Sequence, residues 1–185
     1  MAAKLEPILT IPKRFKIILG GRGSTKSMGV GSIAASRAKD YGYKTMCVRE
    51  VQNTIEDSVH ALLKKIIQDN GWMNFNITDK HIQLDGQDVF KFRGIARNPF
   101  GVQSTFGFKY LWGEEAQTFS HKSIEVLTPS IREEGSEQCF TLNAQSSQDA
   151  FSLRFLKPFW NDIINHGYYE DDLHLIVLIN YKDNP

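Results

Sequence analysis

The sequence predicts an α/β fold with a mainly parallel central sheet flanked by helices. Short apolar segments alternate with helical patterns along the chain, turn residues separate them, and the last segment, Leu173–Ile179, is apolar almost throughout. A strand that is buried on both faces is typically such an unbroken apolar run. Strands that alternate with helices form βαβ units, whose strands run parallel.

Length and composition agree with one globular domain. The chain has 185 residues, of which 41% are hydrophobic and 23% charged, and these values exclude a disordered, collagen-like or coiled-coil chain. The formal net charge of +1 gives no overall attraction to DNA or to an anionic membrane. No apolar run reaches the ~18 residues that a membrane span needs, so no membrane partner is expected.

The first part of the chain is predicted to be an arm followed by alternating strands and helices. Residues 1–13 contain two prolines and are predicted as an N-terminal arm, and residues 14–185 as the domain proper. An apolar run that ends at two glycines predicts a strand at Phe15–Leu19. A helix is predicted from Lys26 to Tyr41, and a second strand at Thr45–Val48.

The next part of the chain is predicted to form a helix followed by antiparallel strands. Asn53–Asn70 has apolar residues at helical spacing, and Thr54 with Asp57 resembles a capping box. Residues 74–95 then alternate between apolar and polar side chains with period two, and Asp85-Gly86 is a hairpin signal. We expect an antiparallel β-hairpin insertion around residues 74–95.

The remaining segments continue the alternation. Strands are predicted at Phe108–Trp112, Gln138–Leu142 and Leu173–Ile179, and helices at Ser120–Arg132 and Phe151–Ile164, each broken at a proline. In parallel sheets, ligands bind outside the carboxyl ends of the strands. The loops that follow the strands are therefore where functional residues are expected.

The loop after the first strand is a candidate phosphate-binding loop. It reads Gly20-Gly21-Arg22-Gly23-Ser24-Thr25-Lys26-Ser27 and opens a predicted helix. Its glycines let backbone N–H groups turn toward an anion, Lys26 can reach the β and γ phosphates of ATP, and the Ser27 hydroxyl can ligate Mg²⁺. Thr25 stands where the usual G-x-x-x-x-G-K-[ST] pattern has its second glycine. A β-branched residue there strains the loop if its φ is positive, which would impair activity.

An acidic pair follows a later strand. Glu114 and Glu115 come directly after the strand-like segment that begins at Phe108. In an NTPase with a phosphate loop, the first acid holds Mg²⁺, directly or through water, and the second polarises the attacking water. We therefore predict Glu114 as the metal-binding acid and Glu115 as the general base.

These motifs resemble the ATPase domain of tailed-phage terminase large subunits, the motors that package DNA into procapsids. The matching segments are GGRGSTKS at 20–27, REVQNTIEDSV at 49–59, YLWGEEA at 110–116, TLNAQSS at 141–147 and INYKDNP at 179–185. The likeness spans about residues 14–185. It implies a P-loop NTPase fold of the RecA/ASCE-like type, which binds Mg·ATP and hydrolyses it to drive DNA translocation.

The resemblance implies roles for further residues. Arg22 resembles the family's arginine that contacts the γ-phosphate in cis, and joins Glu114 and Glu115 as a predicted catalytic residue. Asn143 matches the polar residue of the family's coupling motif and is predicted to bind nucleotide, although Ala144 follows it where the family often has proline.

Other polar side chains remain open as contributors to the site. Arg49 and Gln52 follow the second strand and could face the nucleotide. Family members also use an arginine from a neighbouring subunit. Arg93 and Arg97 are both candidates for that role, and the sequence does not choose between them.

The family context implies partners and a location. The expected partners are double-stranded viral DNA, the portal of the procapsid, a small terminase subunit and further copies in a homo-oligomeric ring, all in the host cytoplasm. The ATPase half alone is expected to be able to remain monomeric. Terminase large subunits usually continue into a nuclease domain, which is absent from these 185 residues, so no nuclease activity is expected.

Two alternatives remain open at this stage. One is a nucleotide-binding fragment with weak or no hydrolysis, because of Thr25 or because neighbouring subunits are missing. The other is a different P-loop motor, such as a helicase ATPase.

Overall fold

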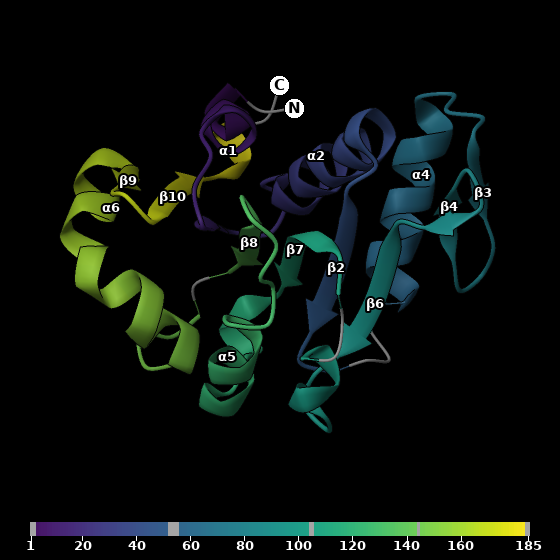
Figure 1. The fold of residues 1–185 in the computed structure, drawn as a ribbon. Coiled ribbons are helices and arrows are strands. Elements are labelled where there is room, and N and C mark those ends of the chain that lie inside the picture. Colours follow the sequence, from purple (N-terminus) through teal and green to yellow (C-terminus); the bar gives the residue numbers. More distant parts are fainter. Residues whose placement is uncertain (1–2, 52–55, 104–105, 144, 184–185) are drawn as a thin grey trace.

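A seven-stranded sheet forms the centre of the fold (Figure 1). The structure is a computed structural model that describes residues 3–51, 56–103, 106–143 and 145–183. In spatial order the strands are β6 (Phe90–Gly94), β2 (Lys44–Arg49), β7 (Phe108–Glu114), β8 (Glu137–Leu142), β1 (Phe15–Gly20), β10 (His174–Ile179) and β9 (Tyr168–Glu170). Neighbouring strands run parallel except β9, which is antiparallel to β10. The predicted mainly parallel sheet is confirmed.

Helices cover both faces of this sheet (Figure 1). Successive residues of β1 pack into different hydrophobic cores. Ile18 packs with the helices α2 (Lys26–Tyr41) and α4 (Ala61–Asp69). Ile17 packs with α5 (His121–Leu127) and with the segments η5 (Ser152–Leu156) and α6 (Trp160–His166). This alternation is the period of a strand that is buried on both sides, and it produces three layers.

The N-terminal residues fold onto this assembly. They form η1 (Ala3–Leu5) and α1 (Glu6–Thr10), whose Leu5 and Ile8 side chains are completely buried. The Lys16 ammonium, also completely buried, donates a 2.8 Å hydrogen bond to the carbonyl of Ile8 and forms a 2.9 Å ion pair with Glu137. The first strand is thereby tied both to α1 and to β8.

The predicted helix at Asn53–Asn70 is described only from Glu56 onward. A π-helical turn, η2 (Glu56–His60), leads into α4, which ends before Gly71. Thr54 lies outside the described residues, as does the side chain of Asp57, so the predicted capping box is not tested.

The predicted antiparallel insertion is present, with one difference at its end. Strands β3 (Phe75–Ile77), β4 (Ile82–Leu84) and β5 (Gln87–Asp88) form a small antiparallel sheet, and Asp85 and Gly86 make its turn with φ of +50° and +79°. The last segment, β6, instead pairs parallel with β2 in the central sheet. Its Phe90 and Phe92 are buried in the core beneath α4, and this packing places the strand at the sheet edge.

Short helical segments replace parts of the longer helices that the sequence predicts. The helix predicted at Ser120–Arg132 ends at Leu127, before Pro129, and that predicted at Phe151–Ile164 is divided into η5, η6 (Lys157–Phe159) and α6. The other short elements are η3 (Pro99–Val102), η4 (Ala116–Thr118) and η7 (Tyr181–Asp183). Among the helices described, none is both long and apolar enough to cross a bilayer.

Candidate active site

The phosphate loop leaves β1 at a position that only glycine can occupy. A Cβ on Gly20 would lie 2.3 Å from the carbonyl oxygen of Ile179 at the end of β10. Thr25, at the other end of the loop, has φ of +54° and ψ of +13° and directly precedes α2. Strain at Thr25 was predicted only for a positive φ, and the structure has that φ.

Lys26 lies inside the loop and connects it to the end of β8. It is 8% exposed, and its ammonium donates hydrogen bonds of 3.0 Å to the Gly21 carbonyl and 2.7 Å to Asn143 Oδ1. Burial lowers the pKa of Lys26, and the negative charges of Glu114 and Glu115 act in the opposite direction. Two residues that the sequence placed in separate motifs are thus in direct contact.

Ser27 and Glu114 also meet, since the Ser27 hydroxyl donates a 2.7 Å hydrogen bond to Glu114 Oε1. The other oxygen, Oε2, accepts a 3.1 Å hydrogen bond from the buried Trp112 indole and another from the Thr141 hydroxyl. Neither of these two contacts was predicted from the sequence. Trp112 is completely buried, and its indole also orients the acid. The only signal for Thr141 is its place two residues before Asn143.

The Ser27 hydroxyl and the Glu114 carboxylate fit a magnesium site. Mg²⁺ takes oxygen ligands, keeps several waters and usually needs only one or two protein groups besides substrate phosphates. One hydroxyl and one carboxylate converge here at the mouth of the phosphate loop. These two residues are therefore suited to hold the metal.

Glu115 directly follows β7 and has a left-handed backbone conformation, with φ of +54° and ψ of +45°. Its carboxylate forms a 2.8 Å ion pair with Arg49, and its side chain is 45% exposed. Arg49 ends β2, which is the neighbour of β7. The structure thus brings Arg49 to the acidic pair, and Gln52 lies outside the described residues.

A further contact joins the acidic pair to Asn143. The backbone N–H of Asn143 donates a 3.2 Å hydrogen bond to the side chain of Gln117, two residues after Glu115. Gln117 was not expected in the site. Because glutamine is common in surface turns, its residue type gives no signal of this role.

The predicted arginines lie apart from these contacts. Arg22 is exposed and makes no hydrogen bond or ion pair with the described residues. Arg93, half-buried, belongs to β6, and Arg97 follows that strand as an exposed residue. Three strands separate β6 from β1, so both lie toward the sheet edge that is far from the phosphate loop of the same chain.

Comparisons with solved structures agree with this architecture. The chain superimposes on the N-terminal domain of the DNA packaging ATPase of bacteriophage phi29 with a TM-score of 0.71 at 13% identity, covering 94% of both chains. The large terminase of the thermophilic bacteriophage D6E in complex with ADP matches with a TM-score of 0.75 at 14% identity. That match covers 99% of this chain but 46% of the D6E chain, so the chain spans slightly less than half of that protein.

The same D6E protein in complex with ATP-γ-S matches with a TM-score of 0.73 at 14% identity, over 99% of this chain and 45% of that one. At such identities these matches establish the fold alone. No curated protein sequence gives a significant match. The profile of the phage terminase large subunit family, in contrast, matches residues 12–185. The chain therefore belongs to the phage terminase large subunit family.

Proposed function

We propose that this domain binds Mg·ATP at residues 20–27 and hydrolyses it to drive viral DNA into a procapsid. The observation that supports this proposal best is the convergence of three motifs at the carboxyl ends of β1, β7 and β8. Lys26 contacts Asn143, and Ser27 contacts Glu114, so residues from all three strand ends form one continuous polar site.

The side chains divide the chemistry between them. Lys26, held in a position of low exposure, offers a cation to the β and γ phosphates. Gly20, Gly21, Gly23, Ser24 and Thr25 shape the loop around those phosphates. Glu115 is the general base that accepts a proton from the attacking water, and its ion pair with Arg49 fixes the direction of the carboxylate.

Ser27 and Glu114 would hold the magnesium ion, which neutralises negative charge on the β and γ phosphates. Trp112 and Thr141 keep one Glu114 oxygen engaged, so that Oε1 remains directed at Ser27. Arg22, exposed in the loop, is free to turn toward the γ-phosphate and offset the charge that develops there.

Arg93 or Arg97 would serve a neighbouring copy in a ring. Both lie toward the far edge of the sheet, where they could contact the nucleotide of another subunit rather than their own. Turnover is then expected to rise faster than linearly with protein concentration. Replacing each arginine separately by alanine identifies the one responsible, and unchanged turnover in both variants under assembling conditions would refute the role in trans.

A weakly active nucleotide-binding module is the second candidate, and the backbone of Thr25 favours it. A threonine with φ of +54° stores strain in the loop that must fit the phosphates. This candidate predicts tight Mg·ADP binding with a turnover no higher than that of a Glu115→Gln variant.

The working assembly would include double-stranded DNA, the portal and a small terminase subunit in the host cytoplasm. The viral genome packaging motor assembly of bacteriophage phi29, which contains a chain similar to this one in fold, supports an assembled context. The proposed metal site is tested by measuring ATP binding with and without Mg²⁺. Ser27→Ala and Glu114→Ala should abolish the gain in affinity that Mg²⁺ gives the wild type, whereas Ser146→Ala should retain it. Equal magnesium dependence in all four proteins would contradict the assignment.

A further inference from the structure

The outer edge of β6 forms the floor of an open groove. Among the described residues, β6 has β2 as its one neighbour in the sheet. The groove has a volume of about 380 Å³, and its lining includes Phe90 and Phe92 of this strand. Three strands separate it from β1, so it is distinct from the nucleotide site.

The hydrogen bonds to β2 determine which backbone groups face the groove. Thr45 donates to the Val89 carbonyl at 2.8 Å, and Ile95 donates to the Arg49 carbonyl at 3.0 Å. In a parallel ladder, alternate residues of one strand bond to the same neighbour. Residues 91 and 93 therefore face β2, and the N–H and C=O groups of Phe90, Phe92 and Gly94 point outward.

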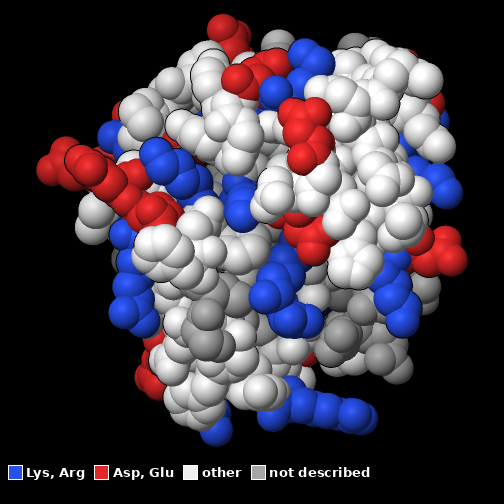
Figure 2. All heavy atoms as spheres, turned by 45° about the vertical axis from the view of Figure 1, so that its right-hand side comes forward, with Lys and Arg blue, Asp and Glu red and all other residues white. Residues whose placement is uncertain are grey.

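The side chains around this edge are mainly cationic, with one large aromatic ring. Figure 2, which brings this side of the molecule forward, shows Lys and Arg side chains near the middle of the face with acidic side chains around them. The cations that line the groove are Lys44, Lys80, Lys91 and Arg93. Asp88 is the single acid among its described lining residues, and it already pairs with His81 at 3.3 Å. Phe106, also in the lining, is 91% exposed.

We propose that this groove binds an extended acidic segment of another protein, which adds as a strand to the free edge of β6. An added strand satisfies the outward donors and acceptors with its own backbone. Its carboxylates meet Lys44, Lys80 and Lys91, which leaves Arg93 available for the role in trans proposed above, and an apolar side chain covers Phe106. A free strand edge with unpaired backbone groups and nearby side chains that suit the added strand is a known kind of peptide-binding surface.

The edge geometry favours a peptide over a nucleic acid. A strand edge presents N–H donors and C=O acceptors in equal number, and a peptide backbone matches both. Phosphate oxygens only accept hydrogen bonds, so a nucleic acid backbone would leave the outward carbonyls of Phe90 and Phe92 facing negative charge.

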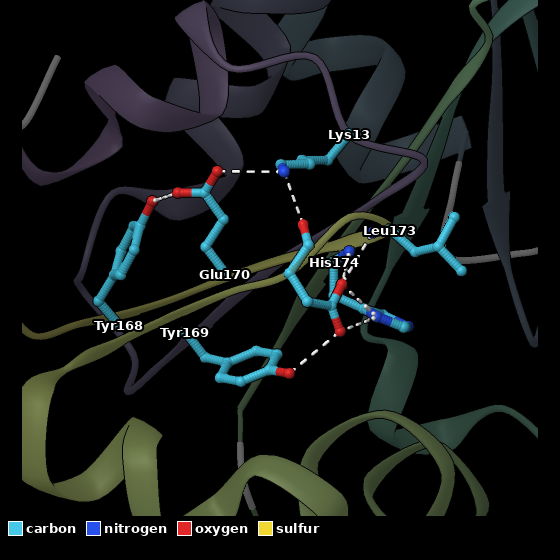
Figure 3. A network of polar contacts seen from close by, with 7 residues as sticks. Lys13, Tyr168, Tyr169, Glu170, Leu173 and His174 are labelled. Carbon is cyan, nitrogen blue, oxygen red and sulfur yellow. Dashed lines mark hydrogen bonds and ion pairs between the residues drawn. The ribbon is translucent and has the colours of Figure 1, made fainter.

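A second copy of this chain is a poorer source of the added strand, because the carboxylates at its own acidic edge already have partners. That edge is β9, whose Glu170 is shown in Figure 3, and Asp171 follows this strand. Glu170 pairs with Lys13 at 3.1 Å and accepts a hydrogen bond from Tyr168. Asp171 accepts hydrogen bonds from the backbone of Leu173 and His174 and from the side chains of His174 and Tyr169. These carboxylates would have to give up their partners before they could reach the cations of another copy.

The test uses a fluorescein-labelled nine-residue peptide in which valine and glutamate alternate. Fluorescence anisotropy should detect binding, and a valine–lysine peptide of equal length should not bind. Amide exchange by NMR should show new protection at Phe90, Phe92 and Gly94, while residues 91 and 93 are already protected by β2. Methylating alternate amides of the peptide should abolish this protection.

Matched variants distinguish peptide binding in the groove from an effect of the protein's net charge. Lys80→Glu with Lys91→Glu should weaken the peptide about tenfold, because it reverses two of the four cations. Lys64→Glu with Lys65→Glu makes the same change in net charge on the exposed face of α4 and should leave binding unchanged. Equal weakening in the two double variants would overturn the proposal.

Three other outcomes would also overturn it. One is the absence of protection at the three outward amides when the peptide is saturating. Another is protection of these amides by a double-stranded DNA oligonucleotide but not by the peptide. The last is protection that rises with protein concentration alone, which would make a second copy the occupant.

Discussion

The side-chain oxygen of Asn143 accepts a 2.7 Å hydrogen bond from the Lys26 ammonium. Lys26 begins α2 directly after the phosphate loop, and Asn143 follows β8, so the bond joins two neighbouring strand ends. The Asn143 backbone is in turn bonded to Gln117, next to the acidic pair. We expect this hydrogen bond to compete with any phosphate that Lys26 approaches, so that nucleotide binding is coupled to the end of β8.

Removing the Asn143 side chain distinguishes two roles for it: a competitor for Lys26, or the nucleotide contact that the family resemblance implies. Asn143→Ala is expected to tighten Mg·ADP binding about threefold, because Lys26 no longer breaks a hydrogen bond in order to reach the β-phosphate. Calorimetric titration measures the effect, and Gln145→Ala in the same loop is the matched control. Weaker ADP binding in Asn143→Ala would mean that Asn143 supports the nucleotide instead of competing for Lys26.

Relaxing the backbone of Thr25 should stabilise the fold. A β-branched residue at φ of +54° costs on the order of 1–2 kcal/mol, and glycine removes that cost. Thr25→Gly is expected to raise the free energy of unfolding in urea by about 1 kcal/mol. Asp85→Gly, at φ of +50° in a turn, should gain less because aspartate tolerates this conformation. A loss of stability in Thr25→Gly would show that its side chain contributes more than the strain costs.

The buried ion pair below α1 should be sensitive to the loss of its acid. Glu137 pairs with the completely buried Lys16 and with Arg37, and burial lowers the pKa of Lys16. Glu137→Ala leaves both cations without this partner and is expected to destabilise the protein by about 3–5 kcal/mol in urea unfolding. Exposed Glu134→Ala should change stability by less than about 0.5 kcal/mol. Similar values for the two variants would contradict the buried pairing.

Asp171 should make the stability depend on acid pH. No structural role for Asp171 was predicted from the sequence. Desolvation raises its pKa, but hydrogen bonds from His174, Leu173 and Tyr169 outweigh this effect and lower the pKa to about 2. An unperturbed aspartate has a pKa of about 3.9, so the folded state favours the ionised form. The resulting stability is present above pH ~4 and is lost as the pH falls toward 2.

Asp171→Asn should therefore have a lower melting temperature than the wild type at pH 6. The melting temperatures of the variant and the wild type should approach each other as the pH is lowered from about 4 toward 2. Asp172→Asn, whose residue is an exposed neighbour, provides the comparison. A difference between Asp171→Asn and the wild type that stays constant over this range would contradict the role of the charge.

The sequence predicted those parts of the fold and of the candidate site in which local chemistry acts alone. Glycines after an apolar run marked the end of β1, and the helical pattern from Lys26 gave the observed bounds of α2. The loop pattern identified Thr25 as the position where a positive φ would cause strain, and the structure has a φ of +54° there. The motif residues Lys26, Ser27, Glu114 and Asn143 do meet, since strand ends of a parallel sheet share one edge.

Contacts set by the tertiary fold could not be predicted in this way. Phe90 and Phe92 alternate with polar residues in the same way as the hairpin strands do, and this period does not show whether the partner is β5 or β2. Trp112 has an apolar body and one N–H group, so its second role at Glu114 depends on what β8 places beside it. The Gln117 side chain accepts a hydrogen bond from the backbone N–H of Asn143, 26 residues away, so this contact depends on the tertiary fold.

The most direct test of ATP hydrolysis at this site compares three proteins: the wild type, Lys26→Ala and Glu115→Gln. Mg·ATP turnover is measured over a series of protein concentrations, and Mg·ADP affinity is measured beside it. The wild type should turn over, Glu115→Gln should lose at least about 100-fold in kcat while it still binds ADP, and Lys26→Ala should lose both properties. Full turnover in Glu115→Gln, or undiminished ADP binding in Lys26→Ala, would contradict the proposed roles of these residues.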